Sequence, residues 1–367
     1  MDNLDRLFKP NSIAVVGAST NQDKVGFQIL HSLRKFPGPL YPVNPKADNI
    51  IGLKAYPDLK SIGSSVDLVI LSIPARACLN AVKQAAQVGA GAVMIASGGF
   101  GETGAEGKAM QDEILSICKE NGIRLLGPNT AGFGAPARRV TANINPWIDR
   151  LSAGSVAVVS QSGSMNLILS SNICDRRLGI SLGVGVGNAA DVGIPEILDY
   201  LAQDEETKAI ALYLEGVSDG RQLYEAIQRT TVKKPIVVFT VGKGDIGEFA
   251  ASHTGSLIGS FELKMSALRQ AGAVPVASTN ILVTAAKILS LVRLEPNSNP
   301  GVALLTGQAG PALIFTDYLR SHGVSMPQLQ PDTVEQLAKV LPPITYIKNP
   351  VDTARPDREL FFLSLIH

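Results

Sequence analysis

The chain has 367 residues, of which 45% are hydrophobic and only 5% aromatic, and its formal net charge is +1. This length predicts two or three domains, and the near-neutral charge argues against nucleic acid or an anionic membrane as a partner. The N-terminus lacks the apolar core of a signal peptide, and no apolar run reaches the length of a membrane span. Three scattered cysteines without a CxxC pair predict free thiols in a reducing cytoplasm, and no metal site is predicted.

One supersecondary opening occurs three times: SIAVVGAS near Ser12, SVAVVSQSGS near Ser155 and GVALLTGQAGPA near Gly301. Each is a short apolar strand, a turn of glycine and small residues, and then a helical pattern, which is typical of parallel α/β layers. We predict a Rossmann-like domain at residues 1–146, a flavodoxin-like parallel-sheet domain at 152–292, and an incomplete third flavodoxin-like α/β domain at 299–367. The third start is followed by only about 65 residues, too few for a domain of the usual size, which favours a fragment of a longer chain.

The first domain offers a nucleotide pocket without the usual dinucleotide signature. Its first turn, VVGASTNQDKVGF, contains Gly17 and Ser19 and falls short of G-x-G-x-x-G. NAD also needs an acidic residue after the second strand, but GPLYPVNPK ends in Asn44, Pro45 and Lys46. A lysine there suits a ligand with an additional phosphate, either coenzyme A or NADP, and so argues against NAD.

Later loops follow further strands of the same domain. VDLVILSIPARA ends a strand at Ile73 and Pro74, and LLGPNTAG follows another strand. Doubly wound sheets bind ligands at such strand ends, although glycine, proline and asparagine also occur there for turn geometry alone. The loop in VMIASGGFGETG adds four candidate cofactor-binding residues: Ser97, Gly98, Gly99 and Phe100.

The second domain holds two candidates for phosphoryl chemistry. In AVVSQSGSMNLIL, Ser162, Gly163 and Ser164 begin an apolar helix, and they form either a phosphate seat or an ordinary serine N-cap. Glu215 ends the strand in AIALYLEGVSDGR, where a carboxylate can orient an imidazole or can simply be solvated. The turn GVGVGNAADVG, with Asn188 and Asp191, has no chemistry that we can assign from sequence.

His253 lies in SHTGSLIGS, among small and hydroxyl-bearing residues. A histidine that accepts and passes on a phosphoryl group needs a free ring nitrogen, nearby anion donors and a flexible backbone, and this segment provides all three. The alternative is a loop histidine without a chemical role.

Together these segments resemble the NDP-forming acyl-CoA synthetases, the family of ADP-forming acetate–CoA ligase and succinyl-CoA synthetase. The resemblance rests on SHTGSLIGS, VVSQSGSMN, ALYLEGVSDGR, SIAVVGAS with PVNPK, SGGFGETG with GPNTAG, and KNPVD, in that family's order. It implies that His253 becomes phosphorylated, that Glu215 holds its ring, and that the helix start at Ser162 and Gly163 receives the phosphoryl group. Gly17, Lys46 and residues 97–100 then match the side that binds coenzyme A.

The resemblance also implies a partner. The sequence has no ATP-grasp domain, so ADP/ATP or GDP/GTP and Mg²⁺ are expected on an ATP-grasp β-type subunit or domain, in a hetero-oligomer that acts on a small acyl substrate. The segment after KNPVD departs from the family's pattern at Thr353 to Pro356. Two alternatives stay open: a non-catalytic CoA or acyl-CoA sensor, and a nicotinamide-dependent dehydrogenase. The acyl group and the choice of ADP or GDP are not readable from the sequence.

Overall fold

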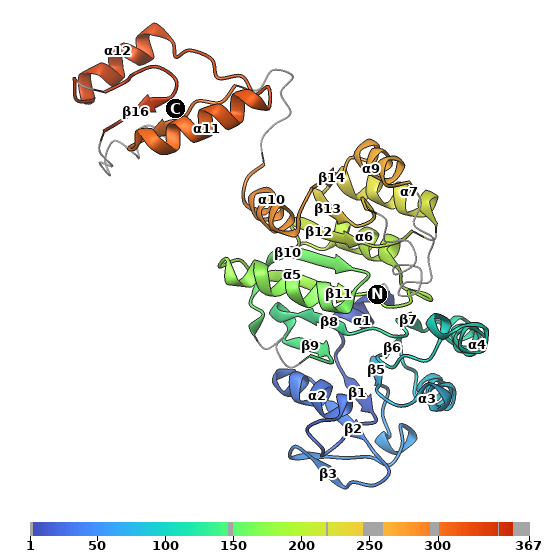
Figure 1. The fold of residues 1–367 in the computed structure, drawn as a ribbon. Helices are drawn as coiled ribbons and strands as arrows, with labels where there is room; N and C mark the ends of the chain where they lie inside the picture. Colours follow the sequence, from blue (N-terminus) through green and yellow to red (C-terminus); the bar gives the residue numbers. More distant parts are fainter. Residues whose placement is uncertain are drawn as a thin grey trace. The chain divides into compact units, whose positions relative to one another are not determined.

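The computed structural model describes residues 3–145, 150–217, 219–244, 260–293, 301–343 and 345–354. They belong to two compact units, Met1–Arg293 and Leu294–His367 (Figure 1). The first two predicted domains therefore share one unit, and the expected mixture of helices and parallel strands is present in both units.

The first sheet is parallel throughout, in the order β2-β1-β5-β6-β7. Its strands are short apolar runs that are almost wholly buried, as a sheet covered by helices on both faces requires. These strands are β1 (Ile13–Val16), β2 (Leu40–Val43), β5 (Leu68–Leu71), β6 (Ala92–Ile95) and β7 (Arg124–Leu126). A small hairpin and three helices accompany them: β3 (Asn49–Ile50), β4 (Leu53–Lys54), α2 (Val25–Ser32), α3 (Ala75–Gln87) and α4 (Ala105–Glu120).

The second sheet has the order β14-β13-β12-β10-β11-β8-β9 and is mixed rather than purely parallel. The β8 strand pairs antiparallel with both β11 and β9, whereas β10 to β14 run parallel. The strands are β8 (Gly132–Ala135), β9 (Val140–Asn143), β10 (Ala153–Ser160), β11 (Ile180–Gly185), β12 (Ala209–Leu214), β13 (Ile236–Thr240) and β14 (Val274–Pro275). The β8–β9 hairpin lies within the predicted first domain, so the change of sheet comes after β7 and not at residues 146–152. The hairpin covers the β11 edge, which would otherwise present unpaired backbone groups.

Helices cover both faces of the second sheet. One face packs against α6 and α7, through buried residues such as Leu198 and Ile227. The other packs against α5 and α10, through Leu169, Ile173 and Leu282. The helices are α5 (Gly163–Asp175), α6 (Ile194–Gln203), α7 (Gly220–Thr231), α9 (Phe261–Gln270) and α10 (Thr279–Leu291).

The N-terminal helix α1 (Asn3–Phe8) joins the two sheets. Phe8 is buried, and its ring contacts Phe133 of β8 edge-on at 5.2 Å between centroids and Tyr200 of α6 at 5.4 Å. One continuous hydrophobic core contains residues from α1 and from both sheets, including Val15 and Val184. This shared core is the physical reason why residues 3–293 form one unit.

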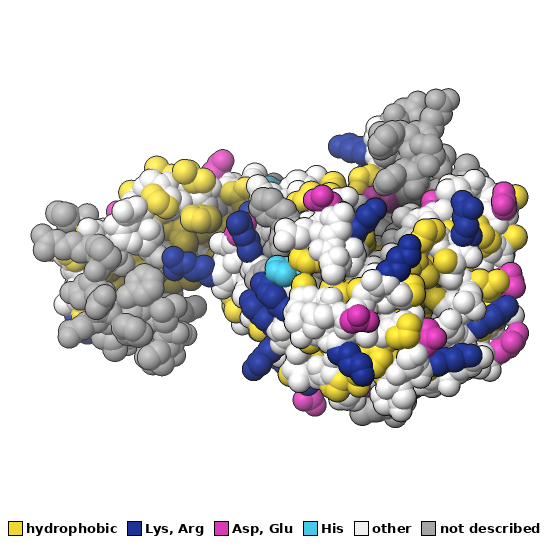
Figure 2. Space-filling model, turned by 90° about the horizontal axis from the view of Figure 1, so that it is seen from below, with side chains coloured by type: hydrophobic (Ala, Val, Ile, Leu, Met, Phe, Trp, Pro, Cys, Tyr) yellow, Lys and Arg dark blue, Asp and Glu magenta, His cyan; other side chains and the backbone are white. Residues whose placement is uncertain are grey.

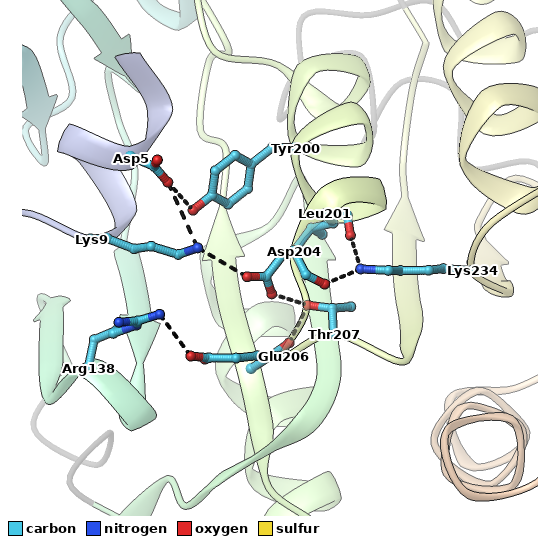
Figure 3. A network of polar contacts seen from close by, with 10 residues as sticks. Asp5, Lys9, Arg138, Tyr200, Leu201, Asp204, Glu206, Thr207 and Lys234 are labelled. Carbon is cyan, nitrogen blue, oxygen red and sulfur yellow. Dashed lines mark hydrogen bonds and ion pairs between the residues drawn. The ribbon is translucent and has the colours of Figure 1, made fainter. Parts of the chain in front are cut away.

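Polar contacts surround this aromatic cluster (Figure 3). Tyr200 donates a hydrogen bond to Asp5 at 3.0 Å, and the ammonium of Lys9 lies 3.2 Å from the carboxylate of Asp204. Thr207 donates to the same carboxylate at 2.7 Å, and Lys234 donates to the backbone carbonyls of Leu201 and Asp204 at the end of α6. We call Asp5, Lys9, Tyr200, Asp204 and Thr207 the helix junction.

The second unit contains two parallel strands and two helices among its described residues: β15 (Leu305–Thr306), β16 (Val351–Asp352), α11 (Ala309–Ser321) and α12 (Pro331–Val340). The buried side chain of Asn349 holds it together, because its amide donates to the carbonyls of Val302 and Pro327, both at 2.8 Å. Leu313 and Ile314 of α11 are largely exposed. The described residues of this unit thus form a small α/β layer.

Charged side chains are mixed on the face seen in Figure 2, where Lys and Arg alternate with Asp and Glu among hydrophobic residues. The described part of this face therefore presents no large field of one sign that could steer a polyanion. Within the described ranges, no helix combines the length and apolar character that crossing a membrane requires.

Candidate functional site

A cleft of about 440 Å³ lies at the carboxyl ends of the first sheet's strands. It opens where the chain leaves β1 and β5, at the point where neighbouring strands lead off in opposite directions, which is the usual ligand site of this architecture. Six of the predicted cofactor-binding residues line it: Gly17, Ser19, Asn44, Ile73, Pro74 and Ser97. Lys24 and Gly26 line it as well, although no motif in the sequence marks either residue.

Two glycines bring the start of α2 against the first turn. A Cβ on Gly26 would lie 1.9 Å from the carbonyl oxygen of Gly17, and Gly17 itself has a φ of +87°. No side chain caps the first turn of α2, whose N-cap residue is Lys24. Backbone amides and a lysine are thus available to a phosphate at this helix start. The sequence gives little indication of this role for Gly26, because it follows Gly17 by nine residues and this spacing does not fit G-x-G-x-x-G.

Five of the residues predicted on this side do not line the cleft: Pro45, Lys46, Gly98, Gly99 and Phe100. Asn44 does line it, and its side chain is held by neighbouring backbone groups. Asn44 donates to the carbonyl of Ala18 at 2.6 Å and accepts from the amide of Lys46 at 2.8 Å, so its side chain ties two loops together. Pro45 and Lys46 follow on the exposed surface. The side chain of Phe100 is fully buried in a hydrophobic core that includes Ile95 and Ile114. The side chain of Phe100 is therefore part of the core, and only its backbone is left for the predicted contact with a cofactor.

The loop from Gly98 to Gly101 is held by a carboxylate. Glu102 accepts from the amide of Gly99 at 2.6 Å and from that of Phe100 at 3.3 Å. Asn188, from the turn after β11, donates to the other oxygen of Glu102 at 2.5 Å. Burial opposes ionisation of Glu102, but the hydrogen bonds from Asn188 and from the two amides outweigh it and hold the pKa of Glu102 below its ordinary value. Glu102 is therefore an anion bound by the protein itself.

The predicted phosphate seat is the N-terminus of α5. Ser162 is its N-cap, and the hydroxyl accepts from the amide of Met165 at 3.4 Å, so the ordinary capping role is present. Ser164 is exposed, and its hydroxyl lies 3.5 Å from that of Ser162. A Cβ on Gly163 would lie 2.4 Å from the Cβ of Ala131, so glycine permits close packing on the loop after β7. The first-turn amides and two hydroxyls gather at one point.

Glu215 lies next to this helix start, because β12 and β10 are neighbouring parallel strands and both end here. Gln161 accepts from the amides of Glu215 and Gly216, at 2.5 and 3.0 Å, and donates to the carbonyl of Gly216 at 2.7 Å. Lys264 of α9 donates to the carbonyls of Glu215 at 3.4 Å and Val241 at 2.9 Å. The backbone of Glu215 is thus held on both sides, by two residues that the sequence analysis did not select.

Two pKa shifts characterise this corner. Burial, and then the nearby carboxylate of Glu215 to which its hydroxyl is hydrogen-bonded, raise the pKa of Tyr213 to about 12. The phenol therefore stays protonated at neutral pH and remains a donor to Glu215. Burial lowers the pKa of Lys264, whose ammonium donates to the carbonyl oxygens of Glu215 and Val241. Glu215 consequently has its amide, its carbonyl and its carboxylate each engaged by a neighbour.

His253, the predicted phosphoryl acceptor, lies outside the described residues, which stop at 244 and resume at 260. The described ends of this interval are close to Glu215, because Val241 and Lys264 are hydrogen-bonded to each other and Lys264 reaches the carbonyl of Glu215. Among the described residues, no three His, Cys, Asp or Glu side chains are grouped so that they could hold a metal ion.

Asn188 and Asp191, left without a role by the sequence, connect the two sheets. Asp191 receives two hydrogen bonds from the guanidinium of Arg124, at 2.8 and 3.3 Å, and one from the amide of Leu125 at 2.8 Å. Both partners belong to β7 of the first sheet. The turn after β11 is therefore bonded to the sheet that forms the cleft.

Comparison with known proteins identifies both halves of the larger unit. Residues 11–136 match a family model described as a CoA binding domain, and residues 153–289 match one described as a succinyl-CoA ligase like flavodoxin domain.

Full-length relatives and solved structures agree with these matches. The chain is 36% identical to subunit alpha of the ADP-forming acetate–CoA ligase II of Pyrococcus furiosus, over 95% of this chain and 76% of the relative. It is 35% identical to the ADP-forming acetate–CoA ligase I of Archaeoglobus fulgidus, over 95% of this chain and 50% of the relative. The structure of a dinucleotide forming acetyl-coenzyme A synthetase 1 from Ca. Korarchaeum cryptofilum, in complex with phosphate and ADP, superposes with a TM-score of 0.88 at 33% identity, covering 96% of this chain and 76% of that one.

Proposed function

This chain belongs to the family of NDP-forming acyl-CoA synthetases, and from that premise we propose how its residues divide the reaction. It is an α-type acid–CoA ligase that interconverts acyl-CoA, NDP and phosphate with the free acid, CoA and NTP. The cleft beside Gly17 and Gly26 binds the CoA, and the edge that carries Ser162 and Glu215 handles the phosphoryl group. One observation supports this assignment of CoA binding and phosphoryl transfer to two sites. Both sites lie at the ends of strands, in neighbouring sheets of one unit.

CoA binding relies on backbone groups more than on side chains. The uncapped start of α2 supplies amides to a phosphate of CoA, and Lys24 supplies a positive charge beside them. Lys46, exposed two residues beyond Asn44, serves the 3′-phosphate from outside the cleft. The apolar residues Ile73 and Pro74 line the inner wall for less polar parts of the ligand.

The phosphoryl group moves in two transfers. Phosphate attacks the acyl carbon, which breaks the thioester bond, releases CoA and gives an acyl phosphate. A nitrogen of His253 then attacks the phosphorus, the bond to the acyl oxygen breaks, and the free acid leaves as its carboxylate. Glu215 accepts a hydrogen bond from the other ring nitrogen and stabilises the charge that develops on the imidazole. Amides at Gly163 and Ser164 stabilise the phosphoryl oxygens.

The second half-reaction needs groups beyond this chain. Two of the relatives at 34–36% identity are named as alpha subunits. This chain covers only 50% of the relative from A. fulgidus, which is not named as a subunit. We infer a β-type ATP-grasp partner that holds the nucleotide and its Mg²⁺, in a hetero-oligomer located in the cytoplasm. The relatives' names include acetate, 4-hydroxybutyrate and feruloyl compounds. The acyl group that this chain accepts is therefore best identified with a panel of acyl-CoA thioesters.

The test is phosphorylation of the purified full chain with labelled phosphate and a panel of acyl-CoA thioesters. We expect base-stable, acid-labile label on the wild-type chain and none on His253→Ala. Glu215→Gln should lower the rate of labelling by about 100-fold, because the imidazole loses its orienting carboxylate.

Matched controls separate chemistry from folding. His322→Ala removes an exposed histidine of the second unit. Glu225→Gln neutralises a carboxylate of α7 whose side chain is 43% exposed and paired with Arg221. Both variants should label like wild type. If the chain stays unlabelled even with a relative's ATP-grasp subunit and labelled ATP, the proposal is wrong, and CoA binding without labelling would identify a sensor instead.

A further inference from the structure

Asn188 is unusual because one amide group donates to two acceptors from the part of the chain that forms the first sheet. Its nitrogen donates to Glu102 at 2.5 Å and to Gln111 at 3.0 Å, while its oxygen accepts from Asn129 at 3.4 Å. Its partners come from α4, from the turn before it and from the loop after β7, all in the part of the chain that forms the cleft. Their distances along the sequence are 59 to 86 residues, so the contact exists only in the folded protein.

The two acceptors in turn hold the loop that follows β6. Glu102 accepts from the amides of Gly99 and Phe100, and Gln111 accepts from the amide of Gly101 at 3.3 Å. Three consecutive loop amides are therefore bound by two side chains, and a single side chain, Asn188, joins those two. We call Glu102, Gln111 and Asn188 the loop latch.

This loop leads directly out of the CoA cleft. Ser97 lines the cleft, donates from its hydroxyl to the carbonyl of Ile73, and accepts at its own carbonyl from the amide of Asn129 at 3.0 Å. Gly99 has a φ of +102°, a conformation that a side chain would strain. The buried ring of Phe100 anchors the far end. The path of the loop between these points depends on the amide contacts of the latch.

We propose that Asn188 is a positioning residue for CoA, which acts from the second sheet through Glu102 and Gln111 on the loop from Ser97 to Gly101. It rests on the proposed function, because it requires that the cleft beside Ser97 binds CoA. Asn188 does not touch the ligand; it sets the loop in its binding conformation before CoA arrives, so less ordering is required on binding. The same contact ties the state of the CoA loop to the sheet that carries Glu215.

The experiment is a set of calorimetric titrations of the full chain with CoA. Asn188→Ala should weaken CoA binding by about five-fold or more, because Glu102 and Gln111 lose their shared donor. Glu102→Gln places an amide donor opposite the donor of Asn188 and should weaken binding similarly. Combining Glu102→Gln with Asn188→Asp reverses the donor and the acceptor of this one contact, while Gln111 stays without its donor. This reversed pair should therefore recover part of the lost affinity and bind CoA more tightly than Glu102→Gln alone. Gln228→Ala, which truncates an exposed amide of α7, is the matched control and should bind like wild type.

Thermal unfolding of each variant distinguishes positioning from general stability. Recovery of affinity in the reversed pair supports the proposal, and that comparison remains available if Asn188→Ala does not fold. The proposal is overturned if Asn188→Ala binds CoA within two-fold of wild type. It is also overturned if the reversed pair recovers thermal stability but no affinity. Failure of the wild-type chain to bind CoA would overturn both this proposal and the proposed function.

Discussion

Two sets of contacts, the helix junction and the loop latch, connect the two halves of the larger unit, and they use different kinds of side chain. The helix junction joins α1 to α6 through an ion pair, a phenol and a buried aromatic cluster. The loop latch joins the turn after β11 to the loop after β6 through amide groups and one carboxylate. The side chain of Asp204 in the helix junction is only 8% exposed, although Asp5, Lys9, Tyr200 and Asp204 also line a surface cleft of about 510 Å³. The latch residues do not line the cleft beside Ser97, but they hold the loop that begins there. We expect the partly buried ionic junction to contribute mainly to stability, and the junction of amides on a loop to contribute mainly to the shape of the binding site.

The largest effect is expected from Asp204→Ala. The substitution leaves Lys9 and Thr207 without their shared acceptor in a partly buried place. The free energy of unfolding should fall by about 3 kcal/mol, measured by denaturant unfolding. CoA affinity should stay within two-fold of wild type, because the cleft does not depend on this junction.

The matched control is Asp199→Ala on the same helix. Asp199 pairs with Arg229, and their side chains are 43% and 54% exposed. Such a surface pair contributes only about 0–1 kcal/mol. Equal losses of unfolding free energy in the two variants would contradict the distinction between a partly buried and an exposed ion pair. A large loss of CoA affinity in Asp204→Ala would contradict the expectation that the helix junction affects stability alone.

The pH dependence provides an intermediate effect. Burial opposes ionisation of Asp204, but hydrogen bonds from Thr207 and Lys9 outweigh it and lower its pKa from the ordinary value of 3.8. An acid whose pKa is lower in the folded protein stabilises it above the ordinary value, and that stability is lost as pH falls through the lower folded value. The difference in unfolding temperature between wild type and Asp204→Ala should therefore be constant from pH 7 to about 5 and shrink below 3.8. A difference that grows on acidification would contradict this sign.

Within the helix junction, the smallest effect is expected from Tyr200→Phe. The ring keeps its contact with Phe8 and its position beside Lys9, and only the hydrogen bond to Asp5 is removed. The free energy of unfolding should fall by about 1 kcal/mol, again without a change in CoA affinity. A loss as large as that of Asp204→Ala would show that the phenol, and not the ion pair, is the main polar contact of the helix junction.

Much of the candidate site could be predicted from short segments. Gly17 follows an apolar strand, Ser162 begins a helix and Glu215 ends a buried strand, and each of these features depends on neighbours within a few residues. Eleven cofactor-binding residues were predicted from a general property of parallel sheets, whose strand ends meet at one edge, and six of them line the cleft. The roles of His253 and of the CoA-binding residues stay proposals until the labelling and binding experiments are done.

The sequence by itself determined the strand–turn–helix units, the family and the residue types at the strand ends, because hydrophobic period, glycine turns and capping are local. Only the tertiary structure decided which sheet the β8–β9 hairpin joins, that Phe100 is a core residue, and that Lys24 faces the cleft. It also decided that Gln161 and Lys264 hold Glu215, and that Asn188 and Asp191 bond to the other sheet. These contacts join residues about 50 to 90 positions apart. Because folding alone brings such residues together, no pattern within a short segment can predict that they pair.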